Sequence, residues 1–392
     1  MSAEAPLFFL IAGEASGDLL GARLMAALKK KTGGVVRFAG IGGPRMKEEG
    51  IELLFPQEDL AHVGLFEIVR HVPHLLRRIK QTIKIVCELK PAALITIDSP
   101  DFCFRVARKV KIMAPSVPLI HYVAPSVWAW RPGRAKKVAR FLTHLLALLP
   151  FEPPYFTREG LDCTFVGHSL IESGAGNGDG ARFRAARGIA SNAPLLAVLP
   201  GSRMSEVRRL LPIFYETVVL LKASFPDLQV VVPLASGVAP FIRKEVADWP
   251  VTVHFTEDDA AKYDALAAAK AALACSGTIS IELAMARLPS VIAYKINALT
   301  AALYRRLIKL KYATLVNIMM DREVMPEYIQ EKCEPAKLAE AVSRLMRDEA
   351  ARATQTAVLG ALAEWLGEGS FVPSERAAEV VLSVVEKGKP AC

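Results

Sequence analysis

Short apolar runs alternate with longer amphipathic stretches through most of the chain, which is 392 residues long. This alternation is typical of βα units built around parallel sheets. In the first half we expect strands at 6–12, 35–40, 92–97, 118–123, 144–149 and 163–166. In the second half we expect a helix at 205–224 and strands at 195–199, 228–232, 251–255, 271–274 and 290–294.

The two α/β halves are separated by a glycine-rich stretch. Its core, GAGNGDG, has Gly at every second position, as in a surface linker. From Pro335 onward the pattern is helical, with no strand candidates. We therefore predict an α/β protein with two doubly wound Rossmann-like domains at 1–172 and 193–348, joined by a linker or long loop at 173–192. A helical tail at 349–392 either crosses back to the first domain or exchanges with a partner chain.

Composition excludes several classes of protein. With 52% hydrophobic and 23% charged residues, the chain is not a disordered, collagenous or coiled-coil protein. The six cysteines form no CxxC pair and no Cys/His ligand spacing, so we expect neither a disulfide framework nor a zinc site, and a reducing cytosol fits. The longest uncharged run, 112–130, contains three prolines, and no basic segment precedes the first apolar run. We thus expect a soluble or peripheral protein without a signal peptide.

The formal net charge of +9 comes from one segment. No Asp or Glu occurs between Phe102 and Phe151, whereas the same stretch holds nine basic residues. The other 342 residues carry 40 basic and 40 acidic groups, so the excess is local. It calls for a local explanation, such as an anionic ligand or an anionic surface.

Two loops of the first half are candidates for chemistry. The turn after the first strand, Gly13–Asp18, is not the G-x-G-x-x-G of dinucleotide binding, and Ser16 or Asp18 can simply cap the next helix. Asp98 follows the strand at 92–97, where parallel sheets place ligands. A carboxylate there can act as a general base on a hydroxyl. Asp101 suits a helix N-cap better, so Asp98 is the preferred catalytic candidate.

Aromatic and basic residues are interleaved in the stretch from His121 to Arg131, which contains Trp128 and Trp130. Such a stretch can stack the bases of a single-stranded nucleic acid, line a groove for a sugar or lipid, or fill the core. Two Trp residues in one loop beside several cations favour a binding site. No known nucleic-acid-binding module occurs in the chain.

The second half offers two anion sites in βα turns. Gly201, Ser202 and Arg203 follow one strand and begin a helix, and Ser276, Gly277 and Thr278 do so after another, with Glu282 one turn further along. Backbone N–H groups at a helix start and a guanidinium both bind phosphate. The pair suits a nucleotide diphosphate whose ribose hydroxyls meet Glu282. No P-loop sequence is present.

The stretch 63–86 combines apolar residues with cations seven positions apart and has Pro73 at an expected helix start. An apolar face bordered by cations can lie in an anionic membrane surface. The alternative is a crossover helix that packs on the sheet. The candidate membrane-facing residues are Leu65, Phe66, Val69, Val72, Leu75 and Leu76.

Several of these motifs together resemble the lipid-A-disaccharide synthase family. In order along nearly the whole chain they are AGEASGD at 12–18, GGPRM at 42–46, IDSPDF at 97–102, HYVAPSVWAWR at 121–131, LPFE at 149–152, VGH at 166–168, LPGSR at 199–203 and SGT…E at 276–282. Two positions depart from the family pattern: Cys103 stands where Asn is usual, and Val316 replaces a Pro before Asn317.

The resemblance implies a GT-B fold, in which the two domains face a cleft, and an inverting glycosyltransferase. UDP-2,3-diacylglucosamine would be the donor and 2,3-diacylglucosamine 1-phosphate the acceptor, giving the β-1,6-linked disaccharide 1-phosphate and UDP. Asp98 would be the base, and no metal or other cofactor is expected. The implied acceptor-site residues are Glu14, Ser16, Asp18, His121, Ser126 and Trp128, and the implied UDP-binding residues are Gly201, Ser202, Arg203, Ser276, Gly277, Thr278, Glu282 and Asn317.

The resemblance also implies work at the cytoplasmic face of the bacterial inner membrane, on anionic phospholipid. We expect no nucleic-acid partner, and a homodimer is one assembly that an exchanged tail would give. Two rival functions stay open. One is another GT-B enzyme or an epimerase that uses UDP-N-acetylglucosamine. The other is a non-catalytic peripheral protein that binds nucleotide or anionic lipid.

Overall fold

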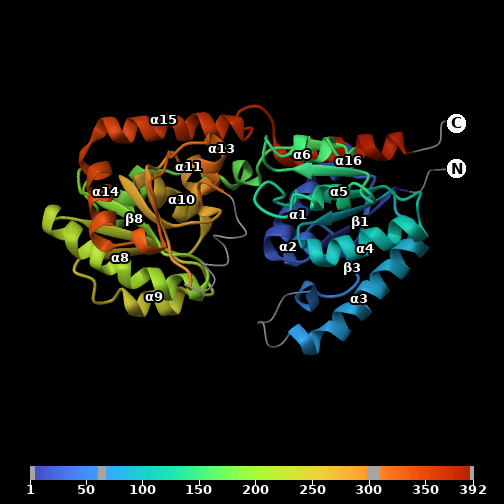
Figure 1. Ribbon diagram of the computed structural model, residues 1–392, viewed down its shortest axis with the longest axis horizontal. Helices are drawn as coiled ribbons and strands as arrows, with labels where there is room; N and C mark the ends of the chain where they lie inside the picture. The colour runs from blue at the N-terminus through green and yellow to red at the C-terminus, as the bar shows by residue number, and fades with distance from the viewer. Residues whose placement is uncertain (1–4, 61–67, 298–309, 389–392) are drawn as a thin grey trace. The chain divides into compact units, whose positions relative to one another are not determined.

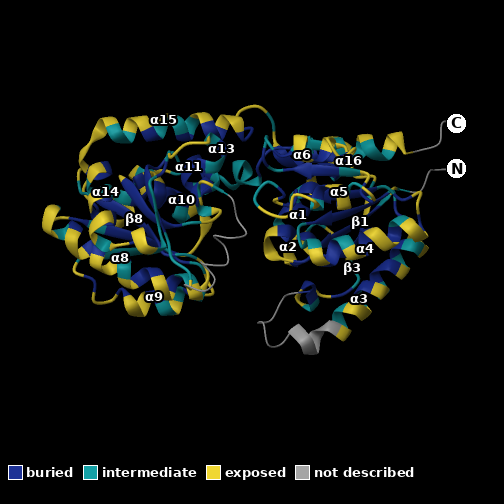
Figure 2. Cartoon of the chain, viewed as in Figure 1, coloured by how far each residue is buried: buried dark blue, intermediate teal, exposed yellow. Residues whose placement is uncertain are grey.

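The computed structural model describes residues 5–60, 68–297 and 310–388, and it divides into two compact α/β units (Figure 1). The first unit comprises Met1–Ser169 and Leu366–Cys392, and the second comprises Leu170–Trp365. In both units the central strands are buried, and many of the exposed residues lie on the outer faces of the helices (Figure 2).

The first unit contains a seven-stranded parallel sheet in the order β3-β2-β1-β4-β5-β6-β7. Its strands are β1 (Leu7–Ala12), β2 (Arg37–Ile41), β3 (Glu52–Leu53), β4 (Ala93–Ile97), β5 (Leu119–Tyr122), β6 (His144–Ala147) and β7 (Cys163–Phe165). The strand order reverses direction between β1 and β4. In doubly wound sheets ligands bind at this switch point, beyond the carboxyl ends of the strands.

Helices cover both faces of the first sheet, which explains why its strands are apolar on both sides. They are α1 (Ala15–Lys31), α2 (Pro44–Glu48), α3 (Ile68–Leu89), α4 (Pro100–Met113), α5 (Arg134–Val138), α6 (Pro153–Thr157) and α16 (Pro373–Lys387), with a 3-10 turn at Gln57–Leu60. Alternate residues of β1 enter different cores: Phe8 and Leu10 pack in the core with α1 and α16. Phe9 and Ile11 pack in the core with α3 and α4.

The second unit contains a six-stranded parallel sheet in the order β10-β9-β8-β11-β12-β13. Its strands are β8 (Leu195–Leu199), β9 (Gln229–Pro233), β10 (Thr252–Thr256), β11 (Ala271–Cys275), β12 (Ser290–Tyr294) and β13 (Glu327–Ile329). The switch point lies between β8 and β11. The helices are α7 (Gly180–Arg187), α8 (Met204–Ser224), α9 (Ala239–Glu245), α10 (Asp259–Ala268), α11 (Ile279–Met285), α13 (Leu315–Met320), α14 (Pro335–Arg347) and α15 (Glu349–Trp365), with 3-10 turns at Ser169–Ser173 and Gln330–Lys332.

The last helix, α16, belongs to the first unit although it follows the second in sequence (Figure 1). It packs against α1. Lys30 forms an ion pair with Glu375 at 2.6 Å, and Lys31 forms one with Glu379 at 2.7 Å. The preceding helix α15 belongs to the second unit, and the chain returns to the first unit at Leu366, within the expected tail at 349–392.

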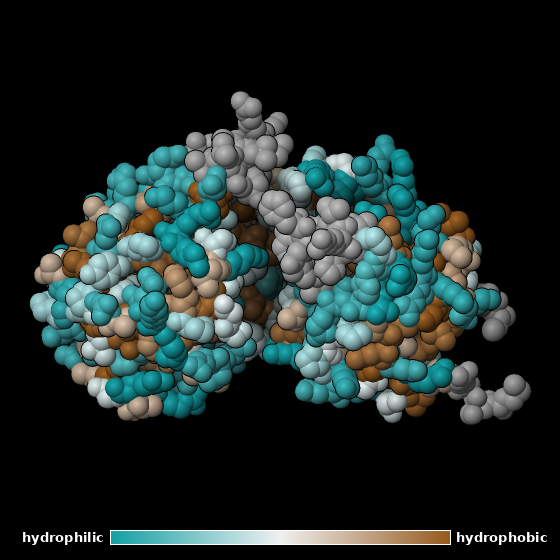
Figure 3. All heavy atoms as spheres, turned by 90° about the horizontal axis from the view of Figure 1, so that it is seen from below, coloured by the Kyte–Doolittle hydropathy of each residue, from teal (hydrophilic) through white to brown (hydrophobic). Residues whose placement is uncertain are grey.

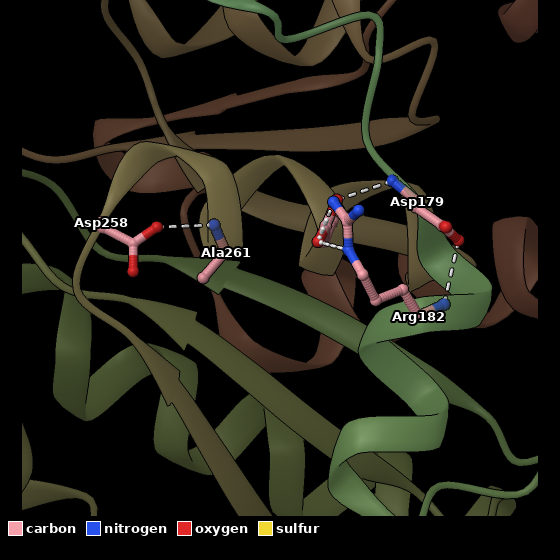
Figure 4. A network of polar contacts seen from close by, with 5 residues as sticks. Asp179, Arg182, Asp258 and Ala261 are labelled. Atoms are coloured by element: carbon pink, nitrogen blue, oxygen red, sulfur yellow. Dashed lines mark hydrogen bonds and ion pairs between the residues drawn. The ribbon is translucent and has the colours of Figure 1, made fainter.

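The glycine-rich stretch expected as a linker or long loop at 173–192 lies in large part against α10. Asp264 on α10 accepts both guanidinium hydrogen bonds of Arg182 at 2.8 Å and the backbone N–H of Asp179 at 2.7 Å (Figure 4). A Cβ on Gly178 would lie 2.1 Å from the carbonyl oxygen of Tyr263. This glycine therefore permits a close backbone approach, a use of Gly that differs from the flexibility of a linker.

Every expected strand is present, with ends shifted by two residues at most. Two short strands, β3 and β13, were not expected, because two or three residues at a sheet edge leave little apolar pattern. The expected helix start at Pro73 is wrong: α3 begins at Ile68 and contains Pro73. A proline so near the start removes only one intrahelical hydrogen bond.

Candidate active site

The loops after β1 and β4 meet at the switch point of the first sheet. A Cβ on Gly13 would lie 2.5 Å from the hydroxyl of Ser99. Asp98 and Ser99 both have left-handed backbones, with φ of 49° and 44°. Such conformations cost non-glycine residues of order 1–3 kcal/mol each and cluster at functional sites. The partly exposed Asp98 is thus held at the sheet edge by a strained turn.

Three acceptor-site candidates lie at the start of α1. Glu14 and Ser16 are exposed beside this turn. Asp18 is 3% exposed, and its carboxylate accepts backbone N–H bonds from Gly43, Arg45 and Met46 at 2.8–3.0 Å. Asp18 therefore holds the start of α2 and does not present its charge to solvent.

His121, another candidate, is buried at the end of β5. Its Nδ1 lies 2.8 Å from Oγ1 of Thr96, and its ring packs on Phe104 at 4.6 Å between centroids. Burial, with a smaller effect of the positive charge on Arg134, lowers the pKa of His121 to about 3. The imidazole is therefore neutral at physiological pH and acts as a packed wall of the site.

The aromatic loop 123–131 follows β5 at the same sheet edge. Val123 has φ of 81°, which is rare for a β-branched residue. Ser126 is exposed and Trp128 is half-buried. Arg131 stacks on Trp130, with its guanidinium carbon 4.1 Å from the ring centroid. The loop thus carries exposed polar, aromatic and cationic groups together.

Glu152 contacts this loop and is a site residue that no sequence pattern singled out. It is 3% exposed and accepts hydrogen bonds from the Trp128 indole N–H at 3.2 Å and from the Leu149 backbone N–H at 3.1 Å. Burial raises the pKa of Glu152 to about 7, although these hydrogen bonds lower it. The LPFE motif was visible in the sequence, but only the fold shows that its carboxylate reaches Trp128.

A pocket of about 540 Å³ opens at the switch point of the second sheet. Volumes of this order hold small-molecule ligands. Its lining includes Gly201, Ser202, Arg203, Ser276, Gly277, Thr278 and Glu282, so the structure brings together seven of the eight UDP-binding candidates.

Arg203 stands at the start of α8, which follows β8. Its guanidinium donates to Glu206 at 3.0 Å, while 77% of its side chain is exposed. Gly201 has φ of 118°, and a Cβ there would lie 2.8 Å from a Glu206 carboxylate oxygen. Glycine therefore lets the loop close on Glu206, which directs Arg203. No sequence pattern singled out Glu206.

Glu282 on α11 is held by Lys262 on α10, a residue that the sequence analysis missed. The Lys262 ammonium lies 2.9 Å from Glu282 and 2.8 Å from Asp259. Burial lowers the pKa of Lys262, but the charge of Glu282 and the hydrogen bonds that Lys262 donates to both carboxylates outweigh it, and the net pKa is raised. Lys262 stays charged and fixes Glu282 at the pocket wall. Position 262 sits in an Ala-rich helix that looked ordinary in the sequence.

Thr256, at the end of β10, also lines the pocket. Thr256 is 3% exposed, and its hydroxyl makes no hydrogen bond within the described part of the chain. A buried hydroxyl without a partner is costly. A ligand in the pocket can supply that partner.

Asn317 does not line this pocket. It is fully buried on α13, and its amide binds the backbone of Val324 and Met325 and the carboxylate of Glu327. Glu327 also accepts from the backbone N–H of Ala313, whose carbonyl oxygen accepts from Ser276 at 3.4 Å. Asn317 therefore reaches the pocket only through this chain of contacts.

The two departures from the family pattern are both buried. Cys103 is 0% exposed on α4, and its backbone N–H donates to the Ser99 carbonyl at 3.0 Å. Val316 is 0% exposed within α13. Neither side chain points into the pocket or replaces a charged group.

An apolar groove of about 680 Å³ lies between α3 and α4. Leu76, Ile79, Ile83 and Met113 line it, and its exposed cations are Lys80, Lys84, Arg105, Arg108 and Lys109. Hydrophobic surface (brown) lies beside hydrophilic surface (teal) on this unit (Figure 3).

The membrane-facing candidates divide into three groups. Leu76 is 44% exposed in the groove, whereas Leu75 packs partly on the core. Leu65 and Phe66 lie outside the described residues, as do the side chains of Val69 and Val72. Among the helices that the structure describes, none is both long and apolar enough to span a bilayer.

Sequence comparison with known proteins matches this chain over nearly its whole length. A family model described as lipid-A-disaccharide synthetase matches residues 8–381. The chain is 57% identical to the lipid-A-disaccharide synthase of Rhodospirillum centenum over 381 residues, which cover 97% of this chain and 95% of that protein. It is 50% identical to that of Paramagnetospirillum magneticum over 385 residues, which cover 98% of each.

Solved structures confirm the expected GT-B fold. The calicheamicin glycosyltransferase CalG4 matches with a TM-score of 0.60 over 100% of both chains, at 16% identity. MurG of Acinetobacter baumannii matches with a TM-score of 0.57 over 97% of this chain and 99% of that one, at 13% identity. These likenesses show the fold alone. The sequence relatives show more: the chain belongs to the lipid-A-disaccharide synthase family.

Proposed function

We propose that this glycosyltransferase joins UDP-2,3-diacylglucosamine to 2,3-diacylglucosamine 1-phosphate, giving the β-1,6-linked disaccharide 1-phosphate and UDP. The family and its relatives support a lipid A disaccharide-forming enzyme that acts on a UDP-sugar and a lipid. The assignment of residues to the two substrates rests on the two switch points described above.

Asp98 is proposed as the general base. It removes the proton of the acceptor 6-hydroxyl as that oxygen attacks the anomeric carbon of the donor, and the C–O bond to UDP breaks with inversion. General-base catalysis contributes about 10²–10⁴ in rate. The strained turn at Asp98 and Ser99 supports this role, because it fixes the carboxylate before substrate arrives. Glu14, Ser16, Ser126 and Trp128 surround the same edge as acceptor contacts, whereas Asp18 and His121 shape it from within.

The second unit is proposed to hold UDP. Arg203 and the backbone N–H groups of Ser276–Thr278 meet the diphosphate, where negative charge grows as the bond breaks. The ion pair to Lys262 orients Glu282 toward the ribose hydroxyls. The Thr256 hydroxyl, which has no hydrogen-bond partner among the described residues, is proposed to bind the uracil base. Because Arg203 supplies the charge for the leaving group, we expect turnover without a metal ion.

The donor assignment rests on the groups that line one pocket at the switch point. They are the Arg203 guanidinium, the small-residue loops and the Glu282 carboxylate that Lys262 holds. Isothermal titration with UDP tests it. Arg203→Ala should weaken binding about tenfold or more, because a charge-assisted bond to phosphate is lost. Arg208→Ala, on the same helix but outside the pocket lining, is the control. An unchanged UDP dissociation constant for Arg203→Ala would contradict the assignment of this pocket to UDP.

The groove between α3 and α4 is proposed to lie on anionic phospholipid at the cytoplasmic face of the inner membrane. Its apolar floor can enter the headgroup region while five cations meet lipid phosphates. Three of those cations belong to the acid-free segment that holds the entire charge excess. This arrangement would bring the enzyme to substrates whose acyl chains are anchored in the bilayer.

A further inference from the structure

Glu152 is a buried carboxylate that the mechanism above does not use. It immediately precedes α6, the position of an N-cap, yet its side chain makes no capping bond. The side chain turns inward and accepts from Trp128 and Leu149. No described cation pairs with Glu152. The unfavourable burial of its carboxyl group is therefore offset only by these hydrogen bonds.

Trp128 is fixed at two points by this arrangement. Its indole N–H donates to Glu152, and its ring meets Phe151 edge-on at 5.3 Å between centroids. Both partners come from the turn after β6. The neighbouring Trp130 has no such anchor, being 43% exposed and stacked by Arg131.

This anchor joins the turn after β6 to the edge that carries Asp98. β4, β5 and β6 are neighbours in the sheet, so the loops that follow them share one edge. The Asp98 N–H donates to the Tyr122 carbonyl at 3.0 Å, and the Val123 N–H donates to the Leu146 carbonyl at 3.0 Å. The loop 123–131 follows and makes short backbone hydrogen bonds of its own. Val127 packs in the core, and the Trp128 indole attaches the loop to the turn after β6.

We infer that Glu152 is a positioning residue of the acceptor site: its carboxylate holds the Trp128 indole, and thereby the loop that presents Ser126 and Trp128 to the acceptor sugar. The inference rests on the proposed assignment of this edge to the acceptor. It concerns only the acceptor, because Glu152 belongs to the first unit and the UDP pocket belongs to the second.

Steady-state kinetics with donor and acceptor varied separately test the inference. Glu152→Ala removes both carboxylate oxygens that accept hydrogen bonds, whereas Glu152→Gln keeps one carbonyl oxygen for the indole N–H of Trp128. Trp128→Phe removes the N–H and keeps an aromatic ring. A misplacement of about 1 Å can cost a factor of about 10². We expect Glu152→Ala and Trp128→Phe to lower kcat/KM for the acceptor about 10- to 100-fold, with the UDP dissociation constant within about twofold of wild type.

Two further comparisons distinguish a positioning role of Glu152 from a purely structural role: the conservative Gln variant and the double variant with Trp128→Phe. Glu152→Gln should stay within about threefold of wild type, and the Glu152→Ala/Trp128→Phe double variant should lose no more than either single variant. Trp365→Phe, at an exposed tryptophan of the second unit, is the matched control and should resemble wild type. The indole N–H resonance of Trp128, identified by its loss in Trp128→Phe, should shift in Glu152→Ala.

Three results would overturn the inference. They are a wild-type acceptor kcat/KM in folded Glu152→Ala, losses that add in the double variant, and equal losses in the Gln and Ala variants. If Glu152→Ala does not fold, an unchanged kcat/KM in Trp128→Phe overturns it. Failure of the proposed function looks different: the wild type itself would release no UDP in response to acceptor.

Discussion

At the scale of single residues, the site depends on conformations and contacts that no sequence pattern displays. The sequence placed Asp98 at the end of a buried strand, and the structure agrees. It did not reveal that Asp98, Ser99 and Val123 all have left-handed backbones, since none is a glycine. It also could not show that the Asp18 charge is enclosed by three backbone N–H groups, or that Lys262 reaches Glu282. Such pairings are set by tertiary packing between distant segments.

His121 gives a prediction about acid stability. Its pKa is about 3 in the folded protein, against an ordinary value near 6.5, because burial disfavours the charged ring. The unfolded chain therefore binds a proton between these pH values and the folded chain does not, so stability is complete above pH 6.5 and is lost as the pH falls. The slope is at most about 1.4 kcal/mol per pH unit.

Urea unfolding of wild type and His121→Asn between pH 4 and pH 7.5 measures this effect. The variant should be less stable near pH 7, because the ring packing is lost, but its free energy of unfolding should fall less steeply toward low pH. Parallel curves for the two proteins would show that His121 is not the titrating group.

At the scale of elements, the alternation of apolar runs predicted the strands well because both sheets are covered on two faces. A strand buried on both sides reads as an uninterrupted apolar run. The pattern was less informative where other forces decide the structure. The GAGNGDG stretch looked like a linker, yet part of it packs on α10 through Asp264 and close backbone contact (Figure 4). Whether a glycine provides flexibility or close approach depends on the neighbour, which the local sequence does not contain.

Gly178 tests that distinction. Gly178→Ala places a Cβ 2.1 Å from a backbone carbonyl of α10, which cannot rotate away. Overpacking of this kind typically costs about 1–3 kcal/mol, so the melting temperature should fall by several degrees. Gly237→Ala is the matched control, since nothing lies within 4 Å of its Cβ position. Equal melting temperatures for the two variants would restore the interpretation of 178 as part of a flexible linker.

At the scale of the whole molecule, the chain's organisation combines predicted and unpredicted features. Two doubly wound domains followed from the strand count on either side of position 173. The return of the last helix to the first unit was one of two alternatives, and α16 lies on α1 in this chain. The sequence could not choose between them, since an amphipathic helix does not specify which chain it covers. The charge excess, by contrast, was visible at once because it is confined to one acid-free segment.

The groove between α3 and α4 predicts salt-sensitive membrane binding. Each cation near an anionic surface contributes about 1 kcal/mol, so removing two such cations should weaken partitioning about 30-fold. Sedimentation with phosphatidylglycerol-containing vesicles measures this for Arg108→Gln/Lys109→Gln, with Lys244→Gln in the second unit as control. Binding should also fall steeply as salt is added. Salt-insensitive binding would mean that apolar contact dominates, and equal binding of all variants would place the membrane contact elsewhere.

In the proposed mechanism glycosyl transfer depends on Asp98, and a product assay measures this dependence. Wild type, Asp98→Asn and Asp101→Asn are each incubated with UDP-2,3-diacylglucosamine and 2,3-diacylglucosamine 1-phosphate, and disaccharide and UDP are quantified by mass spectrometry. Asp101 is the matched control, an exposed carboxylate three residues away. Wild type and Asp101→Asn should form both products in equal amounts, whereas Asp98→Asn should lose about 10²-fold or more in turnover while still binding UDP. Wild-type turnover in Asp98→Asn would contradict the account.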